Sequence, residues 1–177
     1  MKTPVLQTER LILRPLTTAD AETVYSGWAS DPEVNKYMVY VLHRSVSETI
    51  EWLKQVEADL NSSDSYLWGF VIRESGQLIG SGGLNFNKGH EMFEVGYNIM
   101  KAHWNKGYTS EAMRAAIDFA ARELGAVRFY GRHSKDNVFS GKVMEKLGFI
   151  YQKDGETAKI DDSSISPSRE YLLNITN

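Results

Sequence analysis

The sequence predicts a single domain of mixed α/β class, a largely antiparallel sheet of six to seven strands flanked by about four helices. Three observations support this fold class. At 177 residues, the chain is long enough for one domain with a substantial core. Strand-like segments occur towards both ends of the chain, and strands and amphipathic helices alternate between them. Short polar turns separate three consecutive strands, which favours antiparallel pairing.

The first predicted elements are a strand and a series of helical segments. RLILRPL alternates apolar and polar residues, which predicts a strand that ends at Pro15. Thr17 or Thr18 then caps a helix that we expect to run to about Trp28. Asp31-Pro32 starts a short helical turn, because proline is favoured at the first helical position. A capping-box pattern opens a longer helix over SVSETIEWLKQVEADL, whose apolar residues follow helical spacing.

The remaining elements alternate between strands and helices. SYLWGFVIRE, LIGSGGLNF and MFEVGYNIM are the three consecutive strands. HWNKGYTSEAMRAAIDFAAREL contains a helix with its apolar residues on one face. The strand AVRFYGR, the helix NVFSGKVMEKLG with Gly148 at its end, and the strands FIYQ and REYLLNI complete the fold. We expect the acidic segment between these last strands, KDGETAKIDDSSISPS, to be a loop.

Composition excludes several classes of protein. Twenty basic and 23 acidic residues give a net charge of −3, which argues against direct nucleic-acid binding. The absence of cysteine excludes disulfides, thiolate metal sites and cysteine nucleophiles, and the four histidines form no zinc-protease pattern, so we expect no metal. The amino terminus lacks a secretory signal, and no apolar stretch approaches the roughly 20 residues of a membrane span. These features predict a cytoplasmic protein without a membrane partner.

The start of the helix near Gly107 is a candidate phosphate site. The first N–H groups of a helix have no intrahelical partner, and with the helix dipole they attract anions. Glycine lets a ligand approach the backbone closely, although on spacing alone a plain loop glycine before a helix is the better explanation. The motif GxxxxGK[ST] is absent, and the nearest GxGxxG candidate, at Gly80, has Asn85 in place of its third glycine. A nucleotide kinase or a Rossmann dehydrogenase is therefore not expected.

Four segments in register carry a resemblance to a known family. TERLILRPL, DPEVNKYM, FEVGYNIMKAHWNKGYTSEAM and NVFSGKVMEKLGF resemble the GNAT superfamily of N-acetyltransferases, specifically its RimJ/RimL-like branch of ribosomal-protein N-terminal acetyltransferases. The resemblance covers about residues 8–175, so we expect one GNAT domain over residues 1–177. It implies a splayed sheet that grips acetyl-coenzyme A between two strands. The pyrophosphate would lie on the loop that opens the second long helix.

The family's pyrophosphate loop maps onto residues 104–109, where Gly107 matches the pattern. Trp104 replaces a glutamine or arginine, Thr109 replaces a smaller residue, and Asn105 stands where the branch usually has glycine. Backbone amides can still bind phosphate, because such binding depends little on side chains. Lys106 either adds a cationic contact or is simply solvated. The cofactor-binding residues that the resemblance implies are Tyr97, Ile99, Trp104, Asn105, Lys106, Gly107, Tyr108, Thr109, Ser110 and Asn137.

The strand FEVGYNI would carry the chemistry of acetyl transfer. By strand alternation, Glu94, Gly96 and Asn98 share one face. The resemblance makes Glu94 the candidate proton acceptor, directly or through water, although an exposed strand glutamate is the alternative. Gly96 marks either a close approach of the pantetheine arm or a packing glycine.

The proton donor for the leaving thiolate is less clear from the sequence. Many GNAT enzymes use a tyrosine at the position that Met144 occupies here, and a thioether cannot donate a proton. Ser140 is the substitute that the branch suggests, and it could equally cap the helix that begins nearby. Asn137 resembles the family asparagine that contacts the pantetheine arm, and helix capping is its alternative role.

The acceptor amine stays open at this point. Tyr37, Tyr40, His43 and Asn98 are the candidate substrate-binding residues. A protein N-terminal α-amine and a small amine, such as an antibiotic, a polyamine or an amino acid, both fit. The acidic segment 154–162 suggests a cationic acceptor or is a solvated loop. A module that binds acyl-coenzyme A without turnover is the alternative function, and a homodimer is an open assembly state.

Overall fold

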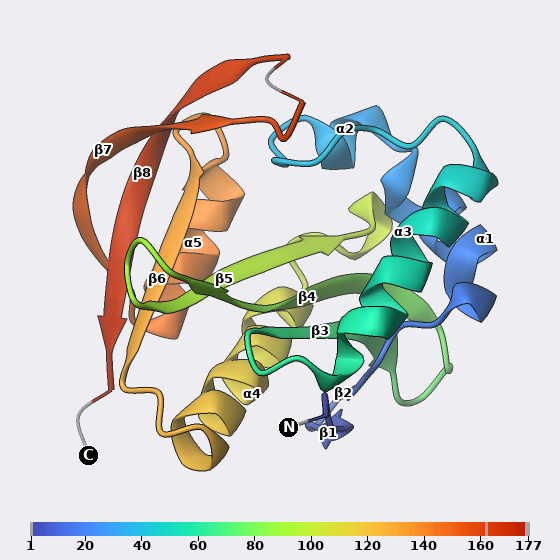
Figure 1. The fold of residues 1–177 in the computed structure, drawn as a ribbon, viewed down its shortest axis with the longest axis horizontal. Coiled ribbons are helices and arrows are strands. Elements are labelled where there is room, and N and C mark those ends of the chain that lie inside the picture. The colour runs from blue at the N-terminus through green and yellow to red at the C-terminus, as the bar shows by residue number, and fades with distance from the viewer. Residues whose placement is uncertain (1, 162, 176–177) are drawn as a thin grey trace.

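The computed structural model describes residues 2–161 and 163–175 and is built around one eight-stranded sheet (Figure 1). The strand order is β1-β2-β3-β4-β5-β6-β8-β7. The strands are β1 (Leu6–Gln7), β2 (Leu11–Arg14), β3 (Ser65–Ile72), β4 (Leu78–Asn87), β5 (Met92–Ile99), β6 (Arg128–Ser134), β7 (Ile150–Ala158) and β8 (Ile165–Asn174). The described α-helices are α1 (Ala21–Val24), α2 (Pro32–Asn35), α3 (Val46–Ala58), α4 (Tyr108–Glu123) and α5 (Val138–Leu147). The predicted mixed fold is confirmed, with more strands than expected because β1 has only two residues and shows no readable alternation.

The sheet splays between β5 and β6. Every pair is antiparallel except this one, which is parallel and joins only Phe93 to Phe129 and Glu94 to Tyr130. On its other side β5 stays paired with β4 as far as Ile99. The backbone of β5 beyond Glu94 therefore has an open edge towards β6, and the two ribbons diverge in Figure 1. An open strand edge of this kind can accept an extended ligand as an added strand.

Two hydrophobic clusters hold the helices against the sheet. The larger cluster joins α4 and α5 to strands β2 to β6, with Phe93, Val95 and Ile99 of β5 packed near Met113 of α4. The smaller cluster packs the three helices α1, α2 and α3 against the sheet. Its strand residues are Val71 at the end of β3 and Leu78 at the start of β4. Because one face of β5 is packed into the larger cluster, its alternate residues face the other side of the sheet.

The first helical segment is less regular than the sequence predicts. Instead of one helix to Trp28, it consists of a 3₁₀ turn at Thr18–Asp20, then α1, then a π-helical turn at Tyr25–Ala29. The Thr17 cap is confirmed, since the Asp20 carboxylate accepts from the Thr17 N–H at 2.9 Å. The wider π turn lets Trp28 become fully buried in the smaller cluster.

The predicted acidic loop 153–168 is wrong for most of its length. Strand β7 continues to Ala158 and β8 begins at Ile165, so only a short connection separates them. Its Asp162 lies outside the described residues. The side chains of β7 are mostly exposed and polar, so its sequence resembles a solvated loop. Pairing with β8 accommodates some of these charges, since Lys153 lies opposite Glu170 and its Nζ is 3.6 Å from Glu170 Oε2. No helix of the described segments is long and apolar enough to cross a membrane.

Candidate active site

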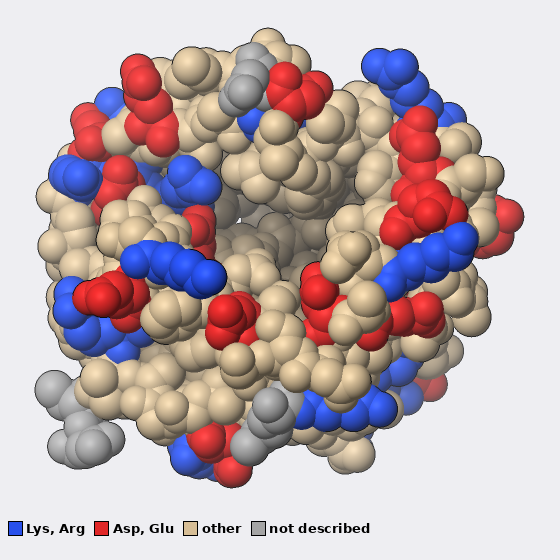
Figure 2. All heavy atoms as spheres, viewed as in Figure 1, with Lys and Arg blue, Asp and Glu red and all other residues tan. Residues whose placement is uncertain are grey.

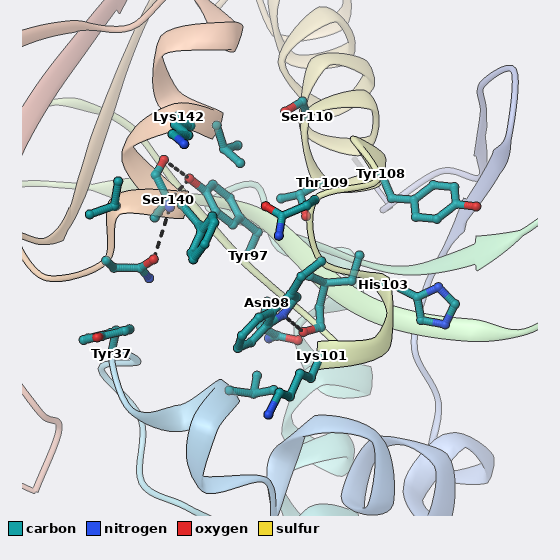
Figure 3. Close-up of a pocket in the computed structure, with 18 of the residues that line it drawn as sticks. Tyr37, Tyr97, Asn98, Lys101, His103, Tyr108, Thr109, Ser110, Ser140 and Lys142 are labelled. Atoms are coloured by element: carbon teal, nitrogen blue, oxygen red, sulfur yellow. Dashed lines mark hydrogen bonds between the residues drawn. The ribbon is translucent and has the colours of Figure 1, made fainter.

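A cavity of about 710 Å³ lies where the end of β5 meets the first turns of α4 and α5 (Figure 3). The predicted site residues that line it are Tyr37, Tyr97, Asn98, Ile99, Trp104, Asn105, Gly107, Tyr108, Thr109, Ser110, Asn137 and Ser140. Lys106 does not line the cavity, and its side chain is exposed. The volume lies within the range of ligand-binding pockets, about 300–1,000 Å³.

The loop before α4 holds two residues in the left-handed region of backbone space. Gly107 has φ of 81° and Asn105 has φ of 60°. Asparagine tolerates this conformation better than most residues, which explains how it replaces the family glycine at 105. The first backbone hydrogen bond of α4 runs from the Glu111 N–H to the Gly107 carbonyl at 3.1 Å. The N–H groups of residues 108–110 therefore precede the helical ladder and are free to bind an anion.

A clamp from the β1–β2 turn fixes this loop. Arg10 Nη1 donates to the Lys106 carbonyl at 3.0 Å, and its guanidinium lies 4.6 Å from the centre of the Tyr108 ring. In Figure 3 that ring points away from the middle of the cavity. Arg10 Nε donates to Glu111 Oε2 at 2.6 Å, and the Thr8 hydroxyl donates to Glu111 Oε1 at 2.5 Å. Burial opposes ionisation of Glu111, yet the hydrogen bonds from Thr8 and Arg10 prevail and lower its pKa.

Trp104 anchors the other end of the loop. Its indole N–H donates to the Ile99 carbonyl at 2.8 Å, and its ring packs against both hydrophobic clusters. The residue that replaces the family's glutamine or arginine is thus a structural support for the loop. Its bond to Ile99 links the loop directly to the end of β5.

The wall of the large cavity carries more positive than negative charge. Its charged residues are four lysines and two carboxylates, a balance of +2: Lys36, Lys101, Lys142, Lys146, Glu33 and Asp136. Lys101 forms an exposed ion pair with Glu33 on the cavity wall. This balance and the free amides of α4 suit a ligand with several phosphates.

Tyr97 and Ser140 meet at the inner end of this cavity. Their hydroxyl oxygens lie 2.9 Å apart, and the Tyr97 hydroxyl also donates to the Ser140 carbonyl at 3.2 Å (Figure 3). Burial raises the pKa of Tyr97, so its phenol is protonated at neutral pH. Asn137 caps α5 by accepting from the Ser140 N–H at 3.1 Å, which leaves the Ser140 hydroxyl free of that task. Met144, buried in the core, contributes no proton.

A second cavity of about 370 Å³ lies on the opposite face of the sheet. Its floor is a row of small and polar residues from four strands: Ser65, Ser81, Gly83, Asn85, Glu94, Gly96, Asn98 and Arg132. Six residues line both cavities, namely Tyr37, Met38, Tyr97, Asn98, Asn137 and Ser140. The two cavities therefore adjoin each other beside the open edge of β5. Figure 2 shows a hollow in the middle of this side of the molecule.

Glu94 is held in a fixed position on this floor. Its Oε1 accepts from Arg132 Nε at 3.0 Å and its Oε2 from Asn87 Nδ2 at 2.8 Å. A carboxylate has about four lone-pair sites, so two remain free to accept from a ligand. Beside it, a methyl group placed on Gly96 would find no atom of the described residues within 4 Å. Gly96 is therefore no packing glycine, and the space above it is open to a ligand.

The β7–β8 hairpin and the α2–α3 connection form a roof over the second cavity. Lys159 Nζ donates to the carbonyls of Met38 and Tyr40 at 3.0 and 3.2 Å, and the Ile160 N–H donates to the Val39 carbonyl at 2.7 Å. In Figure 1 the tip of the hairpin lies beside α2. The roof covers part of the second cavity, through Val39, Tyr40 and Thr157. The sequence did not reveal this feature because the hairpin tip was read as a free loop.

The predicted acceptor-side residues are not all brought together. Tyr37, Tyr40 and Asn98 line the second cavity, but His43 lines neither cavity. The His43 ring instead contacts α3, where its Nδ1 lies 2.8 Å from Thr49 Oγ1. Burial lowers the pKa of His43, which favours the neutral ring. The prediction that it faces the acceptor is therefore not supported by its position.

Three functional candidates were missed by sequence reasoning: Arg10, Glu111 and Arg132. Arg10 and Glu111 are far apart in the chain, and their bond depends on how the first strands meet α4. Arg132 lies in β6, which diverges from β5, so alternation alone does not place it beside Glu94. One signal was available for Arg10, since it lies in the TERLILRPL segment that carries the family resemblance.

Comparison with known proteins agrees with this geometry. A family model described as an acetyltransferase (GNAT) domain matches residues 10–150. A Bacillus subtilis (strain 168) protein named uncharacterized N-acetyltransferase YoaA is 31% identical over 153 residues, which cover 86% of this chain and 85% of that protein. The ribosomal-protein-S5-alanine acetyltransferase from Vibrio fischeri has a TM-score of 0.78 at 15% identity, covering 97% of both chains. The microcin C7 self immunity acetyltransferase MccE, solved with acetyl-CoA and AMP, has a TM-score of 0.81 at 16% identity over 95% of this chain and 94% of that one. The chain therefore belongs to the GNAT acetyltransferase family and is an N-acetyltransferase.

Proposed function

We propose that the protein transfers acetyl from acetyl-coenzyme A to a primary amine by direct attack in a ternary complex. The observation that carries this proposal is the meeting of two cavities beside the open edge of β5, at Tyr97 and Ser140. One cavity suits the phosphates of the coenzyme, and the other contains a fixed carboxylate. The acetyl group could then pass between them without a covalent enzyme intermediate.

The larger cavity would hold the coenzyme. The amides of residues 108–110 would bind the diphosphate, and the lysines of the wall would add charge. The unpaired edge of β5 between residues 95 and 99 would hydrogen-bond the pantetheine arm as an added strand. Acetyl-coenzyme A supplies an acetyl group activated as a thioester. A β5 N–H beside the thioester would polarise its carbonyl, as preorganised backbone donors do.

Glu94 would accept the proton that the amine loses as the new C–N bond forms. Its two unused lone-pair sites face a cavity next to the coenzyme site, and Asn87 and Arg132 hold it in place. An N-terminal α-amino group has a pKa of about 7.7–8.0, so a modest base suffices for such an acceptor. Water could bridge Glu94 and the amine where they are not in direct contact.

The Tyr97–Ser140 pair would stabilise the thiolate that leaves when the C–S bond breaks. An unperturbed phenol has a pKa of about 10 and an alkyl thiol about 8.5, and burial raises the pKa of Tyr97 further. Full proton transfer from this phenol to the thiolate is therefore uphill. The pair would act chiefly by hydrogen-bonding the sulfur, through the Ser140 hydroxyl that Tyr97 orients. The final proton would come from water.

Two acceptor classes remain in the proposal. The likeness to the ribosomal-protein-S5-alanine acetyltransferase supports a protein N-terminal amine, the substrate of the RimJ/RimL-like branch. The roof fastened by Lys159 supports a small amine instead, since it covers part of the cavity that contains Glu94. We favour the small amine because the roof is observed in this chain itself, whereas the support for a protein N-terminal amine comes from a likeness to another protein. A module that only binds acyl-coenzyme A is disfavoured, because a fixed carboxylate in a separate adjoining cavity has no use in such a module.

Release of free thiol from acetyl-coenzyme A tests this function. The assay would use an amine panel of amino acids, polyamines, aminoglycosides and N-terminal peptides. We expect thiol release with at least one amine, and mass spectrometry should find one added acetyl on that amine. Binding of acetyl-coenzyme A without amine-dependent thiol release across the panel would instead support the non-catalytic module.

A further inference from the structure

We propose that the acceptor is a small amine that carries a carboxylate close to its amino group, such as an α- or β-amino acid. Arg132 would bind the carboxylate while Glu94 receives the amine. This inference rests on the proposed function and narrows its substrate class. The observation behind it is an arginine in the wall of the second cavity, in direct contact with the candidate base.

The guanidinium of Arg132 has donors to spare. It presents five N–H groups in a planar fork, a geometry that matches a carboxylate. Its described hydrogen bond uses Nε only, to Glu94 Oε1 at 3.0 Å. About 35% of the Arg132 side chain is exposed even though it lines the cavity, so a ligand can reach it. The groups at Nη1 and Nη2 have no acceptor among the described residues, and a ligand carboxylate would supply one.

The contact between Glu94 and Arg132 limits the spacing of charges in the acceptor. A negative group and a positive group that lie side by side in the wall are complemented by an amine and a carboxylate that lie side by side in the ligand. An α-amino acid places these groups on the same carbon, and a β-amino acid on adjacent carbons. Asn87 holds the Glu94 carboxylate from its other oxygen, so the pair is fixed before the ligand arrives.

The size of the cavity agrees with this class. Its volume of about 370 Å³ is near the lower end for ligand pockets. The hydrogen bonds from Lys159 and Ile160 hold the roof over this cavity. The roof would limit the size of the group attached to the acceptor amine. Aromatic and apolar residues of the roof and α3, including Tyr40, Trp52 and Val56, would surround the side chain of the amino acid.

A purely cationic acceptor, such as a diamine, is the competing class. The charged side chains that line the cavity are Asp59, Glu94 and Arg132, a balance of −1 with histidine neutral. Asp59, however, already accepts from Gln55 Nε2 at 3.2 Å. A second ammonium close to the reacting amine would lie beside the Arg132 guanidinium and be repelled by it. The charges nearest the base therefore favour the zwitterion.

Pairs of amines that differ only in the carboxylate give the test. Thiol release from acetyl-coenzyme A would be measured with free amino acids of several side chains, with their carboxamides, and with diamines of similar length. We expect kcat/KM for the free acid to exceed that for its amide by roughly tenfold or more, the effect of a charge-assisted fork. This comparison of acid and amide uses the unaltered protein, so it does not depend on whether any variant folds.

The variant Arg132→Gln then identifies the recognition residue. It should reduce the acid-to-amide ratio to about one, chiefly by raising KM for the acid, whereas Arg122→Gln on the exposed face of α4 should leave the ratio unchanged. Because Arg132 also positions Glu94, activity on both amines can fall, so the ratio is the readout. Equal turnover of acids and amides, preference for diamines, or an unchanged ratio in Arg132→Gln would overturn this inference. Thiol release with none of these amines or N-terminal peptides would instead contradict the proposed function itself.

Discussion

The hydroxyl oxygens of Tyr97 and Ser140 lie 2.9 Å apart where the two cavities adjoin. One strand and one helix place them there, since Tyr97 comes from the splayed end of β5 and Ser140 from the first turn of α5. Many GNAT enzymes carry a tyrosine at the position of Met144. Here the Tyr97 phenol contacts the same helix, at Ser140.

This arrangement predicts that Tyr97→Phe lowers kcat by roughly ten- to a hundredfold, because the Ser140 hydroxyl loses the partner that orients it. Ser140→Ala should have a similar effect, and the double variant should be little worse than either single variant, since the two act as a unit. Steady-state kinetics check this, with coenzyme affinity from calorimetry as the control. Additive losses, or unaltered turnover in both single variants, would show that the pair does not assist the thiolate.

Replacing Glu94 tests the proton acceptor. Glu94→Gln should lower kcat by about 10²–10⁴-fold, the usual contribution of a general base, and leave coenzyme affinity nearly unchanged. Glu123→Gln, on the exposed end of α4, is the matched control and should behave as the parent protein. Normal turnover of Glu94→Gln would remove this residue from the mechanism.

Gly96 offers a test in which stability and activity move in different directions. A methyl group at this position meets no protein atom within 4 Å, and glycine in a strand interior is destabilising by about 0.5–1 kcal/mol relative to alanine. Gly96→Ala should therefore keep or slightly raise the melting temperature. The same methyl group projects into the space above the floor of the second cavity, so kcat/KM for the acceptor should fall at least tenfold, by roughly 1.4 kcal/mol of transition-state binding. A fall in melting temperature would indicate that the glycine has a packing role after all.

The pKa of Glu111 predicts how acid affects the loop before α4. Its folded-state pKa lies below the ordinary value of 4.5, so the ionised carboxyl stabilises the fold above that pH. This contribution is lost as the pH falls through the folded-state pKa. Glu111→Gln should lower the free energy of unfolding by about 1.5 kcal/mol at neutral pH, with a smaller difference below pH 4.5. Urea titrations at several pH values measure this, and a difference independent of pH would contradict it.

Local sequence patterns predicted those parts of the fold and site that depend on nearest neighbours. Period-two alternation placed Glu94, Gly96 and Asn98 on one face of β5, and all three line the second cavity. Helical spacing and the glycine at 107 located the free amides at the start of α4. These features follow from backbone geometry over a few residues, so they can be predicted from a single sequence.

The contacts that complete the site join segments far apart in the chain, and no local rule encodes them. The bond between Arg132 and Glu94 depends on the angle at which β6 leaves β5. The roof depends on β7 continuing through a polar, exposed stretch, where composition favours a loop but pairing with β8 overrides it. The direction of the His43 side chain was not predictable for a similar reason, because its packing against α3 decides that direction and sequence position does not.

A crystal structure of the protein with coenzyme A is the most direct test of the two-cavity account. We predict that the diphosphate lies on the N–H groups of residues 108–110 and that the pantetheine arm runs along the open edge of β5. The sulfur should lie within hydrogen-bonding distance of the Tyr97 or Ser140 hydroxyl, with the space above Glu94 left for the acceptor. Phosphates bound elsewhere, or a pantetheine arm that fills the second cavity, would contradict the account.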